Sequence, residues 1–147
     1  MAWRIPVEAD LAAALSQREI DAFRASPGRS GDGDPVRAIL DQAAAEARAA
    51  CRSNGKVRLA PAANAIPDSL MRAVMAIVAF DILKRLPVPV GEDRRLAKDD
   101  ALKLLKKVAE GRIVPESDGE ETLVGGPAIE LAGSSRRRVT DRTVEGL

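Results

Sequence analysis

Acidic side chains are the first residues of this 147-residue sequence that could carry chemistry. Asp32-Gly33-Asp34 places two carboxylates at alternating positions, the spacing with which a calcium-binding loop begins. A complete loop needs another oxygen ligand before the glycine and a bidentate glutamate at its end, whereas Pro35 and Val36 follow here. We therefore interpret the segment as a turn that ends in a helix N-cap, and we predict no metal site.

Other carboxylates could act as acid/base pairs or as magnesium ligands. We assign them structural roles instead: a helix start for Asp68, the polar edge of a buried helix for Asp81, and a solvated charged face for Asp99 and Asp100. An enzyme that uses carboxylates and a metal remains an alternative, but we expect neither an enzyme nor a cofactor.

The remaining reactive residue types are scarce. The sequence has no histidine, which removes catalytic triads and most histidine-based acid/base schemes. Its single cysteine, Cys51, lies on an apolar stripe and is interpreted as a small core residue. The loop Ser26 to Asp34 is rich in glycine but lacks the spacing of a phosphate-binding loop. Aromatic residues are only 2% of the chain, so the core must be aliphatic.

Charge is unevenly distributed along the chain. The formal net charge is +1, with an excess of basic residues before position 115 and of acidic residues after it. Arg136, Arg137 and Arg138 could contact phosphate or an acidic partner. Neither half is charged enough to indicate nucleic-acid binding.

No stretch approaches the ~20 apolar residues of a membrane span, so we expect a soluble protein without a membrane partner.

Helical spacing dominates the first half of the chain. Glu8 to Ala25 predicts two short helices or one broken helix, with a restart at Ser16, where Ser16 and Glu19 form a capping box. Asp34-Pro35 then predicts the start of an amphipathic helix with an alanine-rich buried stripe, which ends at Asn54-Gly55.

Two further helices are predicted in the second half. One should open at Ile66-Pro67-Asp68 and run to about Leu86; it is apolar almost all round between Leu70 and Phe80 and should be the central helix. Asp93 to Glu110 should bury a stripe that begins at Ala97, and Arg112 to Pro115 could add a short strand. The prediction is an all-α bundle of four to five helices in residues 1–115, followed by an extended or disordered tail, residues 116–147, that orders on assembly.

The order of these segments carries a resemblance to a known family. Its motifs are the loop Gly31 to Asp34, the alanine-rich run 43–50, the helix that opens Ile66-Pro67-Asp68-Ser69-Leu70, and the helix 101–111, whose form is A-L-x-L-L-x-x-[VI]-A-x-G. Over about residues 3–115 the sequence resembles the Mu-like prophage protein family grouped with phage head–tail connector (adaptor) proteins.

The resemblance implies a structural protein of the virion, made in the cytoplasm of the bacterial host. It implies a homo-oligomeric ring, expected to be a dodecamer, at the head–tail junction beneath the portal protein. The ring would extend the channel through which double-stranded DNA passes and would dock a stopper or tail protein. Basic side chains are our candidates for the subunit or partner interface: Arg94, Arg95, Lys98, Lys103, Arg136, Arg137 and Arg138.

An alternative is a small helical module that regulates or binds nucleic acid. It would use Arg94, Arg95, Lys98 and the terminal arginines against phosphates, with an affinity that falls steeply as salt rises.

Overall fold

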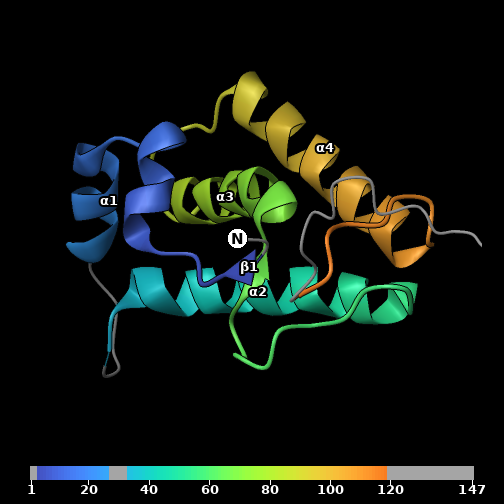
Figure 1. Ribbon diagram of the computed structural model, residues 1–147. Coiled ribbons are helices and arrows are strands. Elements are labelled where there is room, and N and C mark those ends of the chain that lie inside the picture. Colours follow the sequence, from blue (N-terminus) through green and yellow to red (C-terminus); the bar gives the residue numbers. More distant parts are fainter. Residues whose placement is uncertain (1–2, 27–32, 119–147) are drawn as a thin grey trace, which may run out of the picture.

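The computed structural model describes residues 3–26 and 33–118, and these residues form a helical domain with one very small sheet. The elements in chain order are β1 (Trp3–Arg4), the 3₁₀ helix η1 (Glu8–Ala13), α1 (Gln17–Arg24), α2 (Pro35–Asn54), β2 (Ile66–Pro67), α3 (Asp68–Leu83) and α4 (Glu92–Ala109). Figure 1 shows α3 in the middle, with α2 along one side, α4 along the other, and η1 with α1 at one end. The all-α prediction is confirmed.

The central helix is α3, as its composition predicts. Ten of its sixteen residues are buried, because it packs against α2, α4, α1 and η1. One edge, which includes Arg72 and Ala76, reaches the surface along much of the helix. The helix ends at Leu83 rather than near Leu86. Lys84 to Leu86 form backbone turns instead, ahead of Pro87 and Pro89, which disfavour helical geometry in the residue before each.

Local capping chemistry sets the helix boundaries in the first half. The Ser16 side chain accepts a hydrogen bond from the Glu19 backbone, and Glu19 accepts one from the Ser16 backbone, so the predicted capping box starts α1. Asp34 caps α2 by accepting from the Val36 backbone at 3.1 Å. Gly55 ends α2 with φ of +76°, a conformation that favours glycine.

Small side chains let α2 approach the other helices. Its buried residues include Ala43, Ala44, Ala47, Ala50 and Cys51. With so little side-chain volume on this stripe, α2 packs closely against both α3 and α4 along one continuous core.

The sheet joins segments that lie far apart in the sequence. Trp3 pairs with Pro67 and Arg4 with Ile66 in an antiparallel register. Trp3 is buried, and the Arg48 guanidinium carbon lies 5.7 Å from the centroid of its ring. Arg48 also donates to the backbone oxygens of Ala60 and Ala65, which fixes the connection between α2 and β2.

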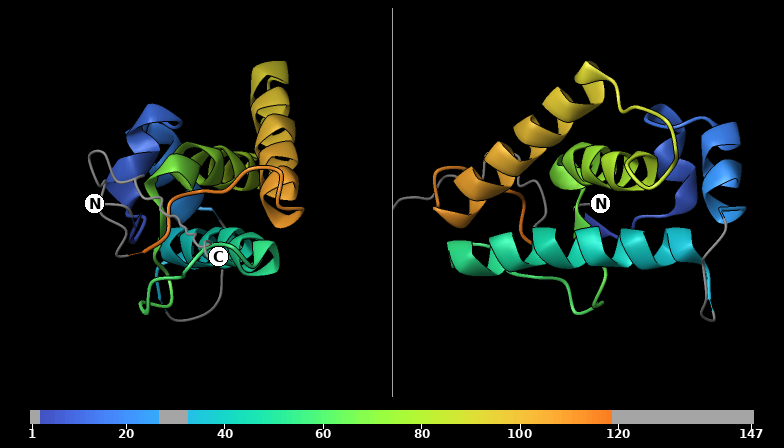
Figure 2. Two further views of the ribbon diagram at one scale, coloured as in Figure 1. Left: turned by 45° about the vertical axis from the view of Figure 1, so that its right-hand side comes forward. Right: turned by 180° about the vertical axis from the view of Figure 1, so that it is seen from behind.

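The last helix lies against the core along its C-terminal half. Ala101, Leu105 and Val108 are buried as predicted, but Ala97 is exposed, because α4 diverges from α3 toward its N-terminal end (Figure 2). Residues 112–115 form no strand. Residues 116–118, which the sequence assigned to the tail, contact the helical domain, and residues 119–147 lie outside the described part of the chain.

Candidate interface surfaces

The four basic residues predicted on α4 do not share one face. Arg94 and Lys98 turn toward the domain: Arg94 Nη2 lies 4.0 Å from Glu19 Oε1 of α1, and Lys98 Nζ lies 4.2 Å from the centroid of the Phe80 ring on α3. Both side chains are half-buried, so their charges are used in part within the fold. They hold the N-terminal half of α4 against its neighbours.

The other two, Arg95 and Lys103, are exposed together with two leucines. Leu96 and Leu102 are 51% and 43% exposed, which is high for large apolar side chains. Leu96 and Lys103 are seven residues apart, as are Arg95 and Leu102, so each pair occupies nearly the same side of the helix. We call these four residues the outer face of α4. Arg136, Arg137 and Arg138 lie outside the described residues.

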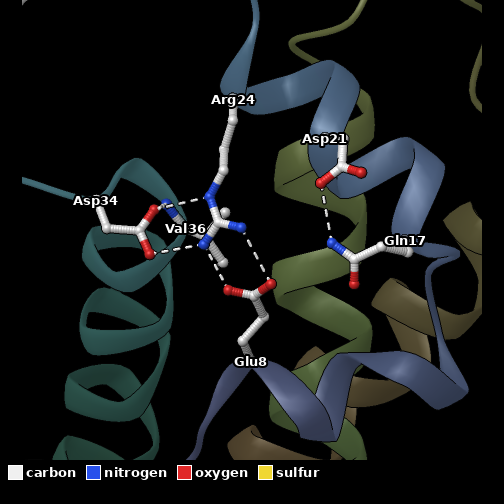
Figure 3. A network of polar contacts seen from close by, with 6 residues as sticks. All are labelled: Glu8, Gln17, Asp21, Arg24, Asp34 and Val36. Atoms are coloured by element: carbon white, nitrogen blue, oxygen red, sulfur yellow. Dashed lines mark hydrogen bonds and ion pairs between the residues drawn. The ribbon is translucent and has the colours of Figure 1, made fainter.

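A charged network fixes the end of the domain where η1, α1 and the start of α2 meet (Figure 3). The Arg24 guanidinium donates to Asp34 Oδ1 and Oδ2 at 3.2 and 2.7 Å and also to both oxygens of Glu8. These two carboxylates raise the pKa of Arg24 further above its usual value. Because Asp34 also caps α2, Arg24 links η1, α1 and the first turn of α2. Sequence reasoning identified the cap but missed the arginine.

A second polar cluster ties the end of the described chain to its beginning. Trp3 Nε1 donates to the Glu116 backbone oxygen at 2.7 Å, and the Ser69 backbone donates to the Glu116 carboxylate at 3.1 Å. Arg58 then donates to Ser117 and accepts from the Asp118 backbone. We call this cluster the terminal clasp. No local sequence signal predicts it, because its partners lie 47 to 113 residues apart.

A groove runs between the exposed edge of α3 and the N-terminal half of α4. It consists of two adjoining hollows, of about 540 and 370 Å³, which share Arg72, Ala76 and Ala97. Ala13 and Arg94 line the first hollow, while Ser69 and Leu104 line the second. We call it the α3–α4 groove. The alanine side chains that line the groove are small, and they leave room for another polypeptide segment.

The single cysteine lies in the core. Cys51 is buried, and this burial raises the pKa of its thiol to about 11, so the nucleophilic thiolate is rare. Within residues 3–26 and 33–118 no three His, Cys, Asp or Glu side chains gather in a way that could hold a metal ion. Over the same residues, no helix has the length and apolar character needed to cross a membrane.

A comparison with protein families shows where the chain belongs. The family described as Bacteriophage Mu, Gp36 matches residues 7–126. The chain belongs to this family. The Gp36 match spans every described helix, from the residue before η1 through α4, and thereby confirms the Mu-like family predicted from the sequence. It continues to residue 126, beyond the terminal clasp. Neither the curated proteins nor the solved structures include a match to the chain.

Proposed function

We propose that this chain is a head–tail connector (adaptor) of a Mu-like phage or a phage-derived particle. Copies form a ring, expected to be a dodecamer, beneath the portal protein, extend the channel for double-stranded DNA and dock a stopper or tail protein. The chain acts through its packed surfaces and turns over no substrate. The observation that carries the proposal is the Gp36 family match across the whole helical domain.

The outer face of α4 supports an assembly role. A closed ring needs two different surfaces that match each other, because each copy contacts its neighbour head-to-tail. Leu96 and Leu102 offer apolar area, and Arg95 and Lys103 flank them with charge. An apolar centre with a charged margin is the usual composition of a protein interface. We assign one of the two ring surfaces to this face.

Electron microscopy of particles that carry variants of the chain tests the assignment. Leu96→Asp with Leu102→Asp should remove the ring from the head–tail junction, because two charges would be desolvated in the contact. Ala45→Asp, on an exposed position of α2, is the matched control and should leave the ring intact. Circular dichroism checks that both variants remain helical.

Three results would contradict the proposal. The first is a ring at the junction in particles carrying the double variant, which would remove the outer face from the contact. The second is a chain that stays monomeric when mixed with its portal protein. The third is a location elsewhere in the particle.

A further inference from the structure

The α3–α4 groove is a surface of the described domain that the helical core leaves open to a peptide. Its walls are apolar at Ala76 and Ala97, and two arginines, Arg72 and Arg94, lie along it. An occupant that fits must bring small or aliphatic side chains together with carboxylates.

The arginines have hydrogen-bonding capacity to spare. Arg94 Nη1 is enclosed yet has no hydrogen-bond partner within residues 3–26 and 33–118, and its ion pair with Glu19 is long at 4.0 Å. Arg72 is exposed and makes no ion pair within the same residues. Of the acidic residues at the groove, Asp68 is already bound to Arg4 at 2.8 Å, whereas Asp100 lies in the second hollow only. The first hollow therefore favours an incoming carboxylate.

The chain itself supplies a segment with this chemistry just after the terminal clasp. Between Arg112 and Arg136 the sequence has no basic residue, and Glu120-Glu121 is followed closely by Leu123-Val124. The Gp36 family match includes these four residues, so they belong to the family's own pattern rather than to an unrelated extension.

The point at which the described chain ends brings this segment near the groove. The Glu116 side chain binds Ser69, which lines the second hollow. Glu120 is four residues after Glu116 and two after Asp118, which Arg58 holds, so it reaches up to about 7 Å beyond the clasp. Arg72 is one turn, about 5 Å, along α3 from Ser69. A segment tethered this closely meets the groove at an effective concentration of the order of millimolar.

We propose that the α3–α4 groove is the docking site for residues 120–124 of the same chain. The carboxylates of Glu120 and Glu121 bind at the arginines, and Leu123 and Val124 cover the alanines. This inference does not depend on the connector role, because it concerns contacts within one copy.

Disulfide trapping in the full chain tests the docking. Ala76→Cys in the groove is combined with Leu123→Cys, and the control combines Ala45→Cys, on an exposed position of α2, with the same Leu123→Cys. Native Cys51 stays in place, because its burial keeps it unreactive. We expect the groove pair to close within the monomer at least about tenfold faster than the control pair. Non-reducing gels and mass spectrometry of linked peptides measure the closure.

Equal rates for the two pairs would overturn the proposal. Disulfides that form between chains rather than within one would also overturn it, because the groove would then bind a second copy. A charge test sharpens the result: Arg72→Glu should slow closure about threefold, and adding Glu120→Lys and Glu121→Lys should restore the rate. A closure rate that Arg72→Glu leaves unchanged would contradict the role of the arginines.

Discussion

The two helices α3 and α4 are similar in length but opposite in what they contribute. Ten residues of α3 are buried, against three of α4, which are Ala101, Leu105 and Val108. The first turns of α4 depend on the long ion pair of Arg94 and on the contact of Lys98 with Phe80. We infer that α3 determines whether the domain folds, whereas the N-terminal half of α4 adds little stability and is available for contacts with other polypeptides.

The largest effect should come from deleting core volume in α3. Ile82→Ala removes a side chain with no solvent exposure and should cost about 2–5 kcal/mol of unfolding free energy, because a cavity remains. Leu102→Ala on α4 should change it by less than about 0.5 kcal/mol. Urea denaturation measures both. If the two variants lost similar unfolding free energy, α3 would not contribute more to stability than α4.

The second-largest effect should be a difference in thiol reactivity between the core and the surface. At pH 8, Cys51 should react with a thiol reagent on the order of 100-fold more slowly than a cysteine introduced by Leu102→Cys, because burial raises the pKa of Cys51 to about 11. The reaction is followed by absorbance, and denaturant should remove the difference. Equal rates in the native protein would show that the core around α2 opens readily.

These two tests concern burial, which the sequence predicts well for α3 and less well for α4. A run of apolar residues needs no tertiary information to indicate a central helix, and Ser16, Asp34 and Gly55 set boundaries through bonds made within a few residues. Ala97 was predicted inside and is exposed, because the divergence of α4 from α3 depends on packing.

The prediction of the interface residues was limited in the same way, because it too depends on how the helices pack. Arg94, Arg95, Lys98 and Lys103 are equivalent in the sequence, yet partners on α1 and α3 draw two of them inward. Neither the pairing of Trp3-Arg4 with Ile66-Pro67 nor the terminal clasp has a signal in local spacing.

A smaller effect should follow from loosening the N-terminal half of α4. Lys98→Ala removes the cation above Phe80 and the side-chain stem that leads to it, and should cost about 0.5–1 kcal/mol. Lys106→Ala, at an exposed position, is the control and should cost less. Hydrogen exchange should show faster opening of residues 92–98 in the Lys98 variant, with α3 unchanged. If α3 opened as well, the two helices would not be independent.

The smallest effect should be a pH dependence at Glu19, which caps α1 and faces Arg94. Hydrogen bonding from the Ser16 backbone, above all, holds the pKa of Glu19 below its usual value. A lowered native pKa stabilises the fold at neutral pH, and this contribution disappears as the pH falls below about 4. Because the side chain is about one-third exposed, the contribution should be under about 1 kcal/mol.

Glu19→Gln should therefore weaken the loss of stability between pH 7 and pH 3, as measured by urea denaturation at both values. Gln42→Ala, at an exposed position of α2, is the control and should leave that difference unchanged. A Glu19→Gln variant with the full pH dependence would show that the lowered pKa of Glu19 does not contribute to the stability of the fold.

The terminal clasp has a mechanical consequence. A force that pulls on the chain beyond Asp118 meets the bonds of Arg58 first and then those of Glu116 to Trp3 and Ser69. Tension is therefore shared among the α2–β2 connection, Trp3 and the start of the most deeply packed helix before it loads α4. A pull on the C-terminal end of a subunit therefore loads the core of the bundle before it loads α4, the helix with the fewest buried residues of the two compared above.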